Sequence, residues 1–178
     1  ATSNGQAGLT GADESVIESS GSRLNTLGIT VGNGASVTAC FARDNTNDGI
    51  QTGTGCTVTG CQAYGNGDDG VSLNQKSIAD NCTATLNAGN GFRATAAVAN
   101  IHGCTAASNG MDGIIAFYGS HIANCVLNDN GGDGIEVGSD SYVLSNVSSG
   151  NAGAGIRANN NDNRIDSNTV SDNARVSS

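Results

Sequence analysis

The chain has 178 residues, the length of a single domain. Hydrophobic residues make up 37% of it and aromatic residues only 3%, with 27 glycines and no proline or tryptophan, which excludes a conventional core built on leucine and phenylalanine. Seven basic and 16 acidic residues give a net charge of −9, which argues against nucleic acid or an anionic membrane surface as a partner. No apolar run is long enough to span a bilayer.

A short repeat, with a period of roughly 21 residues, organises the chain. Taken in chain order, a small anchor residue recurs at this spacing as Ser19, Cys40, Cys61, Cys82, Cys104, Cys125, Asn146 and Asn168. Five positions after the anchors from Cys40 onward stand Asn45, Asn66, Asn87, Asn109, Asn130, Asn151 and Asn173. Nine positions after the anchors stand Gly28, Gly49, Gly70, Gly91, Gly113, Gly134 and Gly155, each followed by a bulky apolar residue. Short apolar–polar alternations between Gly and Asn predict strands of about 3–5 residues with turns between them.

Such a period predicts an all-β solenoid of about seven to eight coils. Each coil turns three corners and rises ~4.8 Å, so equivalent residues stack into ladders. We expect the asparagine ladder to bond neighbouring coils at a corner where Asn tolerates left-handed dihedrals. The glycine row marks a second corner that needs positive φ or a close approach.

The repeat resembles the right-handed parallel β-helix units of the pectate-lyase-like superfamily, over roughly residues 16–173. The resemblance implies a single-stranded right-handed parallel β-helix over residues 16–178, preceded by an N-terminal cap or partial coil at residues 1–15. Gly8 and Leu9 are candidates for the glycine corner of that partial coil. A solenoid without end caps exposes unpaired strand edges, so we expect either an excised fragment or self-association through the ends.

Five of the six cysteines occupy the anchor position and form a predicted cysteine ladder. The interpretation we favour is a column of buried free thiols that pack as small hydrophobic side chains. Vertical disulfides and a metal site are the alternatives, and neither suits thiols spaced by one coil. Cys56 lies outside this column and is a candidate for an exposed thiol.

Two rows of polar residues flank the glycine corner and are the candidate functional face. The outward row after it contains the candidate substrate-binding residues Gln51, Ser72, Glu136 and Arg157, together with Arg93. Just before it stands an acidic row, Asp48, Asp69, Asp112 and Asp133. Paired carboxylates perform acid–base chemistry on glycosides, and Arg93 suits a uronate carboxylate, so Asp48, Asp69 and Arg93 are the catalytic candidates. Asp112 and Asp133 are candidates for a Ca²⁺ site. Asp before Gly is also ordinary turn chemistry.

Two enzyme families share segments with the chain. Asn45–Gly49 and Gly67–Ser72 resemble the Asn-Thr-Asp and Gly-Asp-Asp segments of polygalacturonases, but Gly89-Asn90-Gly91 replaces the expected Gly-His-Gly. Ser141–Asn146 and Gly150–Ile156 resemble the β-helix of mannuronan C5-epimerases, whose Asp-Pro-His motif is absent from a chain without proline. The resemblances imply a polysaccharide lyase, glycoside hydrolase or epimerase fold with an incomplete catalytic set. His102 and His121, the only histidines, are expected at the surface.

Two functions therefore stay open at the level of sequence. The first is a secreted or surface-associated module that binds or processes extracellular polysaccharide, with uronate-containing polymers among the candidate ligands. The second is a structural rod, a stalk or adhesin segment of a larger surface or phage protein, which the short turns and regular period favour.

Overall fold

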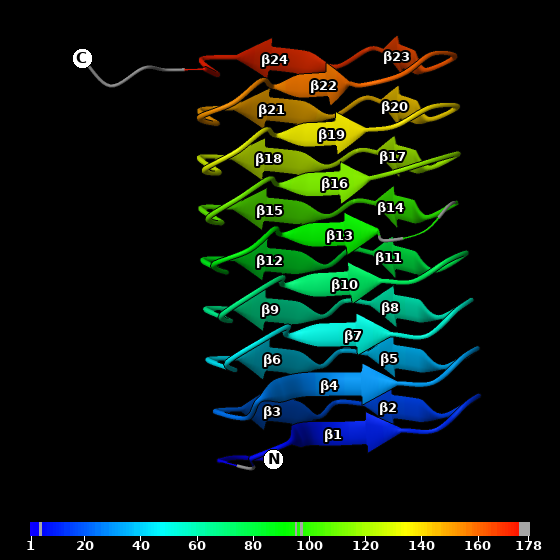
Figure 1. The fold of residues 1–178 in the computed structure, drawn as a ribbon, viewed down its shortest axis with the longest axis vertical. Coiled ribbons are helices and arrows are strands. Elements are labelled where there is room, and N and C mark those ends of the chain that lie inside the picture. The colour runs from blue at the N-terminus through cyan, green and yellow to red at the C-terminus, as the bar shows by residue number, and fades with distance from the viewer. Residues whose placement is uncertain (4, 95, 97, 175–178) are drawn as a thin grey trace.

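In the part of the chain that the structure describes, twenty-four short strands wind into eight stacked coils. The computed structural model describes residues 1–3, 5–94, 96 and 98–174. Figure 1 shows the coils piled along the long axis, with the two ends of the chain at opposite ends of the stack. Within the described residues no helix is long and apolar enough to cross a membrane. The predicted all-β parallel solenoid is confirmed.

The strands form three parallel sheets of eight strands each. Sheet 1 contains β1 (Ala7–Gly11), β4 (Leu27–Val31), β7 (Ile50–Thr52), β10 (Val71–Leu73), β13 (Phe92–Ala94), β16 (Ile114–Ala116), β19 (Ile135–Val137) and β22 (Ile156–Ala158). Sheet 2 contains β2 (Val16–Glu18), β5 (Ser36–Thr38), β8 (Thr57–Thr59), β11 (Ile78–Asp80), β14 (Asn100–His102), β17 (His121–Ala123), β20 (Tyr142–Leu144) and β23 (Arg164–Asp166). Sheet 3 contains β3 (Gly21–Arg23), β6 (Phe41–Arg43), β9 (Gln62–Tyr64), β12 (Thr83–Thr85), β15 (Thr105–Ala107), β18 (Val126–Asn128), β21 (Val147–Ser149) and β24 (Thr169–Ser171).

The repeat sets the register of sheet 1. Ile50 pairs with Ile29 on one side and with Val71 on the other, and this series of apolar residues is fully buried in the middle coils. The adjacent outward residues pair in the same way, so that Gln51 lies between Thr30 and Ser72. At the N-terminal end β1 extends the sheet, with Leu9 opposite Ile29.

The asparagine ladder forms at the corner between sheets 3 and 1. Asn66 is buried, its Oδ1 accepts hydrogen bonds from the backbone N and the Nδ2 of Asn45, and its own Nδ2 donates to Asn87 Oδ1 and Ala42 O. The left-handed residue at this corner is the one before the asparagine, for example Asp44 with φ 55°. The predicted asparagine ladder is confirmed, with the left-handed conformation on the residue before each ladder asparagine and not on the asparagine itself.

The anchor position forms a second ladder at the corner between sheets 2 and 3. All six cysteines are free and buried. The Sγ of Cys61 accepts a hydrogen bond from the N–H of Cys40 at 3.4 Å, and in the same slot Asn146 Oδ1 accepts from the N–H of Cys125 at 2.9 Å. A thiol here is therefore a hydrogen-bond acceptor for the backbone as well as a small apolar group, which explains why asparagine replaces cysteine in the last coils.

Cys56 is buried, so the suggestion of an exposed thiol is wrong. It belongs to a third ladder, at the corner between sheets 1 and 2. In each coil, the residue just before the ladder position at this corner has a left-handed conformation, and the ladder residue itself points inward. The N–H of Cys56 donates to Ser77 Oγ at 3.1 Å, and Cys56 Sγ donates to Gly32 O at 3.0 Å. The members of this ladder are Ser15, Ala35, Cys56, Ser77, Ala99, Ser120, Ser141 and Asn163.

The glycine row is required by close approach between coils. A Cβ on Gly70 would lie 2.7 Å from both Gly91 O and Asn87 Nδ2 and 2.9 Å from Ala84 Cβ. Gly70 does not have positive φ. Of the two reasons offered by the sequence, close approach is the one that applies here.

Candidate functional site

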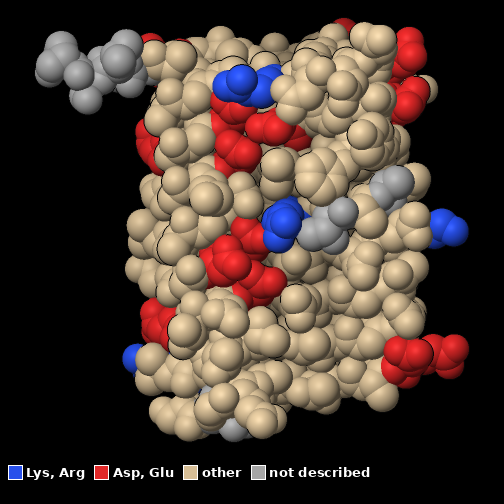
Figure 2. All heavy atoms as spheres, viewed as in Figure 1, with Lys and Arg blue, Asp and Glu red and all other residues tan. Residues whose placement is uncertain are grey.

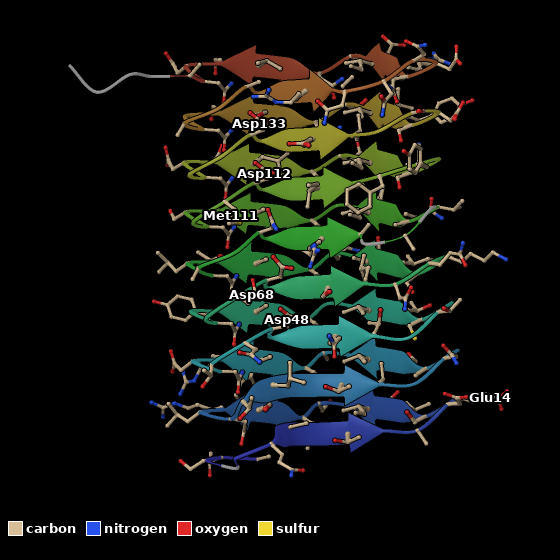
Figure 3. The ribbon with its side chains drawn as sticks, viewed as in Figure 1. Glu14, Asp48, Asp68, Met111, Asp112 and Asp133 are labelled. Atoms are coloured by element: carbon tan, nitrogen blue, oxygen red, sulfur yellow. The ribbon has the colours of Figure 1, made fainter. Side chains whose placement is uncertain are left out.

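The acidic row lies along the side of sheet 1 where its strands begin, two residues before each strand (Figure 3). One oxygen of each aspartate accepts a hydrogen bond from the backbone N–H one coil further on: Asp48 Oδ1 from Asp69 at 3.2 Å, Asp69 Oδ1 from Asn90 at 2.8 Å, Asp112 Oδ1 from Asp133 at 2.6 Å. Asn90 Oδ1 does the same for the N–H of Asp112. Recurrence of the row therefore has a structural cause. The second carboxylate oxygens of Asp69 and Asp133 face Arg93 and Arg157 instead.

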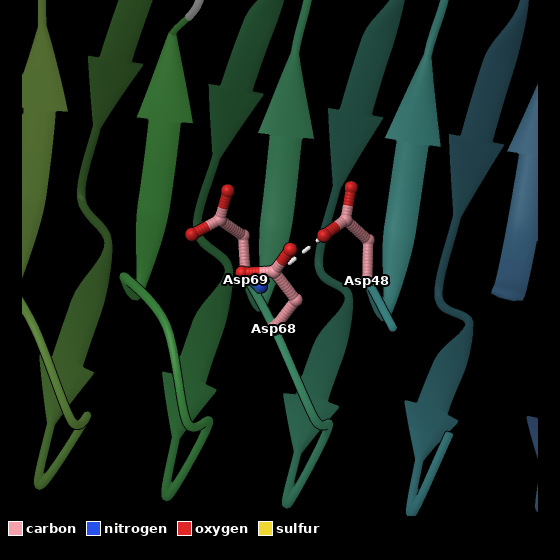
Figure 4. A group of neighbouring side chains, drawn as sticks. All are labelled: Asp48, Asp68 and Asp69. Atoms are coloured by element: carbon pink, nitrogen blue, oxygen red, sulfur yellow. Dashed lines mark hydrogen bonds between the residues drawn. The ribbon is translucent and has the colours of Figure 1, made fainter. Parts of the chain in front are cut away.

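Two acidic clusters stand on this edge. The lower cluster is Asp48, Asp68 and Asp69 (Figure 4), and the upper cluster is Asp112, Asp133 and Glu136. Within each cluster, one carboxylate oxygen per residue lies within 4.8 Å of the others. Carboxylate oxygens suit a hard cation such as Ca²⁺, so both sets could hold one. The calcium expectation for Asp112 and Asp133 stays a prediction.

One arginine accompanies each cluster. Arg93 Nη1 lies 3.6 Å from Asp69 Oδ2, and Arg157 contacts Asp133 through both Nε and Nη2. The Asp69 side chain is only 2% exposed, whereas that of Arg93 is 44% exposed. Among the described residues Asp69 Oδ2 finds no hydrogen-bond donor. Asp69 thus cannot reach a bulky ligand directly, and its influence passes through Arg93 and Asp48.

The carboxyl of Asp48 has a raised pKa. Burial raises the pKa of Asp48 to about 6, and the charges of Asp69 and Asp68 push it in the same direction. Burial also raises the pKa of Asp112. A carboxyl that titrates near neutral pH can act as an acid or a base at an operating pH close to that value.

Asp48 and Arg93 open into one groove of about 370 Å³ on the outer face of sheet 1. Its lining is mainly polar, and comprises Thr30, Val31, Asp48, Gln51, Thr52, Gly53, Ser72, Asn74 and Arg93. The structure therefore brings together Asp48, Gln51, Ser72 and Arg93, with Asp69 beneath the guanidinium. Glu136 and Arg157 stand further along the same face. Thr52 and Asn74 were missed, because no chemical motif marks them and only the register of the strands brings them to the groove.

A larger hollow of about 680 Å³ lies over sheet 3, against Phe41, Arg43, Gln62 and Tyr64. None of the described residues that line it carries a carboxylate, and the lining is mainly apolar. The smaller groove is the better candidate because it contains the perturbed carboxyl and the guanidinium together.

His102 has partners that sequence reasoning missed. Its Nδ1 lies 3.0 Å from Asp80 Oδ1 and its Nε2 3.0 Å from Asn124 Nδ2. Both partners are one coil away, so the period of the repeat was the available signal. His102 is exposed as expected, on the face of sheet 2 and outside the groove.

A family model described as a right handed beta helix region matches residues 3–121 and 51–177. The chain belongs to the right-handed β-helix family. Among solved structures it is similar to the A-module of Azotobacter vinelandii mannuronan C-5 epimerase AlgE6, with 18% identity, a TM-score of 0.66, and coverage of 83% of this chain and 52% of that one. It is also similar to the AlgE4 A-module of the same organism, with 14% identity, a TM-score of 0.57, and coverage of 82% and 64%.

These likenesses establish the β-helix fold. The chain spans between about half and two thirds of the length of the two epimerase modules. No curated protein matches the sequence at a significant level. The function must therefore be argued from the groove itself.

Proposed function

We propose that this β-helix binds an extracellular, uronate-containing polysaccharide along the groove of sheet 1. The observation that carries the proposal is the meeting of an exposed guanidinium, a carboxyl with a raised pKa and a row of hydroxyl and amide side chains in one groove. Two structural relatives bear the name of mannuronan epimerases, which supports a uronic-acid polymer as the ligand class.

Each groove residue has a distinct role in this proposal. Arg93 pairs with a sugar carboxylate through its planar donors. Gln51 and Ser72 exchange hydrogen bonds with sugar hydroxyls. Asp48 accepts a hydrogen bond from a sugar hydroxyl or exchanges a proton with the sugar. Asp69 is a positioning residue that holds Arg93 and keeps the pKa of Asp48 high.

The net charge of −9 on the protein repels a polyuronate, which is itself a polyanion. Long-range repulsion between two polyanions weakens as salt screens it, with a Debye length of about 10 Å at 0.1 M. Salt therefore weakens the long-range repulsion, and it also screens the exposed Arg93–carboxylate pair. A divalent cation held by either acidic cluster would also weaken the repulsion.

Binding is tested by affinity electrophoresis and calorimetry with polymannuronate, polygalacturonate and a neutral glucan. We expect uronate binding that falls at least about tenfold in Arg93→Gln, as for a lost charged pair. Arg43→Gln is the matched control, because Arg43 lies on sheet 3 outside the groove. Absence of binding to all three polymers, or equal loss in both variants, would refute the proposal. Reducing ends and unsaturated products are followed in parallel, and their appearance would extend the role of Asp48 from binding to catalysis.

A structural rod is the second candidate, and the three ladders favour it. The coils stack without a long insertion in the described residues, as expected of a stalk or adhesin segment. The same polymer panel separates the two functions, because a rod binds none of them. Secretion or surface attachment is part of both proposals, and detection of the chain outside cells of its source would support it.

A further inference from the structure

Two aspartates and one arginine of the lower cluster region occur a second time in the upper one. They recur three coils later, and the offset along the chain is the same for all three. The third members of the clusters, Asp68 and Glu136, have no counterpart, because Gly132 and Ser72 stand at the equivalent positions. The matched pairs are Asp48 and Asp112, Asp69 and Asp133, and Arg93 and Arg157.

The contacts recur along with the residues. In each copy the first aspartate accepts the backbone N–H of the second, for Asp48 at 3.2 Å and for Asp112 at 2.6 Å. In each copy the second aspartate pairs with the arginine of the following coil, on the next strand of sheet 1. Between the copies the acidic row is interrupted by Asn90, and after the second copy by Ala154. The same set of two aspartates and one arginine thus occurs twice, three coils apart.

Both copies face the same side of the molecule. Figure 2 shows two patches of acidic side chains on one face, each with a basic group beside it. Three coils at the strand spacing separate the copies by about 14 Å along the axis. The outward residues of sheet 1 join the two guanidinium groups in an unbroken register, with Arg93 beside Ile115 and Glu136 beside Arg157.

The copies differ in whether both oxygens of the second aspartate accept hydrogen bonds from the protein. In the upper copy both oxygens of Asp133 accept hydrogen bonds from Arg157. In the lower copy the buried Asp69 Oδ2 faces Arg93 at 3.6 Å and accepts no hydrogen bond within the described chain. The lower copy also adjoins the groove. It is therefore the principal site, and the upper copy is an auxiliary one in which Arg157, with a side chain 51% exposed, keeps donors free.

We propose that Arg157 and its cluster form a second binding site for the same uronate polymer, which lies parallel to the solenoid axis and pairs one carboxylate with Arg93 and another with Arg157. The inference rests on the proposed function and specifies it, because a duplicated site at a fixed spacing matches a ligand that itself repeats. Once one site is engaged, the second binds within the same complex at a high effective concentration, so affinity rises without new kinds of contact.

Calorimetry with uronate oligomers of increasing length tests this arrangement. The unmodified chain should bind oligomers too short to span about 14 Å weakly, and longer ones tighter by a factor on the order of 10². Arg157→Gln should keep the affinity for short oligomers and lose the gain with length. Arg93→Gln should weaken both, and Arg43→Gln should change neither. Arg157→Lys, which keeps the charge near Asp133, guards against a folding artefact, and it should retain part of the gain.

The outcomes separate this inference from the function on which it rests. If no oligomer or polymer binds, the proposed function fails and the second site fails with it. If uronates bind with one affinity at every length, or the gain with length survives in Arg157→Gln, the function stands and the second site is refuted.

Discussion

The asparagine ladder offers the sharpest test of the physical basis of this fold. Replacing Asn87 with alanine removes a buried side chain that makes four hydrogen bonds. Its Oδ1 accepts from the backbone N of Asn66 at 3.1 Å and from Asn66 Nδ2 at 2.9 Å. Its Nδ2 donates to Ala63 O at 3.2 Å and to Asn109 Oδ1 at 3.0 Å.

The expected loss of stability follows from this inventory. At a net contribution of about 1 kcal/mol per bond, Asn87→Ala costs about 4 kcal/mol. The backbone N–H of Asn66 loses its acceptor in a site that water does not reach, which keeps the loss near this value. Asn173→Ala is the matched control, because Asn173 also makes four side-chain hydrogen bonds but is only partly buried. Water replaces part of what it loses, so we expect about 1–2 kcal/mol there.

Equilibrium urea unfolding gives both values when it is followed by circular dichroism and by thiol reactivity. Agreement between the two probes establishes that a single unfolding transition describes this repeat array. Asn87→Asp adds a second check, since it keeps the shape but turns the donor toward Ala63 O into an acceptor, and it should destabilise the chain more than alanine does. The reasoning is refuted if Asn87→Ala costs no more than Asn173→Ala.

The same geometry makes three further predictions. The pKa of Asp48 is raised to about 6 in the folded chain from an ordinary value of 3.8, so the folded state binds more protons between these two values. The free energy of unfolding therefore falls as pH rises through this range, by at most about 3 kcal/mol. Asp48→Asn should abolish this part of the pH dependence and should be as stable as the unmodified chain below about pH 4. Gly70→Ala should destabilise the chain by several kcal/mol in urea unfolding, because its Cβ would meet backbone and side-chain atoms at 2.7 Å. Gly55→Ala is the control: Gly55 has φ 69° with open space around the Cβ position, so the substitution should cost only about 1–2 kcal/mol. Equal losses of stability in the two variants would contradict this account. All six thiols should resist a thiol reagent in the native chain and react on unfolding, because all six are free and buried. A native thiol that reacts rapidly would disprove the column of buried free thiols.

Much of the fold was predictable because the solenoid translates sequence period directly into space. Once residues one period apart are stacked, the apolar series, the asparagine ladder and the outward row of Arg93 follow without further information. The third ladder escaped prediction since its members, among them Ala35, Cys56 and Ser77, share only small size and no common chemistry. Small residues are common enough in this chain to hide such a row.

The candidate site was predicted in composition and only partly in arrangement. Asp48 and Arg93 stand in different coils, and the sequence named both without showing that they share a groove with Thr52 and Asn74. The burial of Asp69 was also invisible, because the sequence places it in the same row as the more accessible Asp112. Burial depends on which neighbouring side chains close over a residue, and those neighbours lie one coil away.

The sequence by itself determines the β-solenoid and the register of its coils. A strict period of Gly, Asn and apolar residues permits one stacking register, because a shift of one coil against the next would bury polar side chains. Which charges act together is settled only when the coils are stacked. An electrostatic field depends on distances of a few ångströms and on exclusion of water, so the same Asp-before-Gly signal yields a carboxyl with a raised pKa at Asp48 and one paired with an arginine at Asp133.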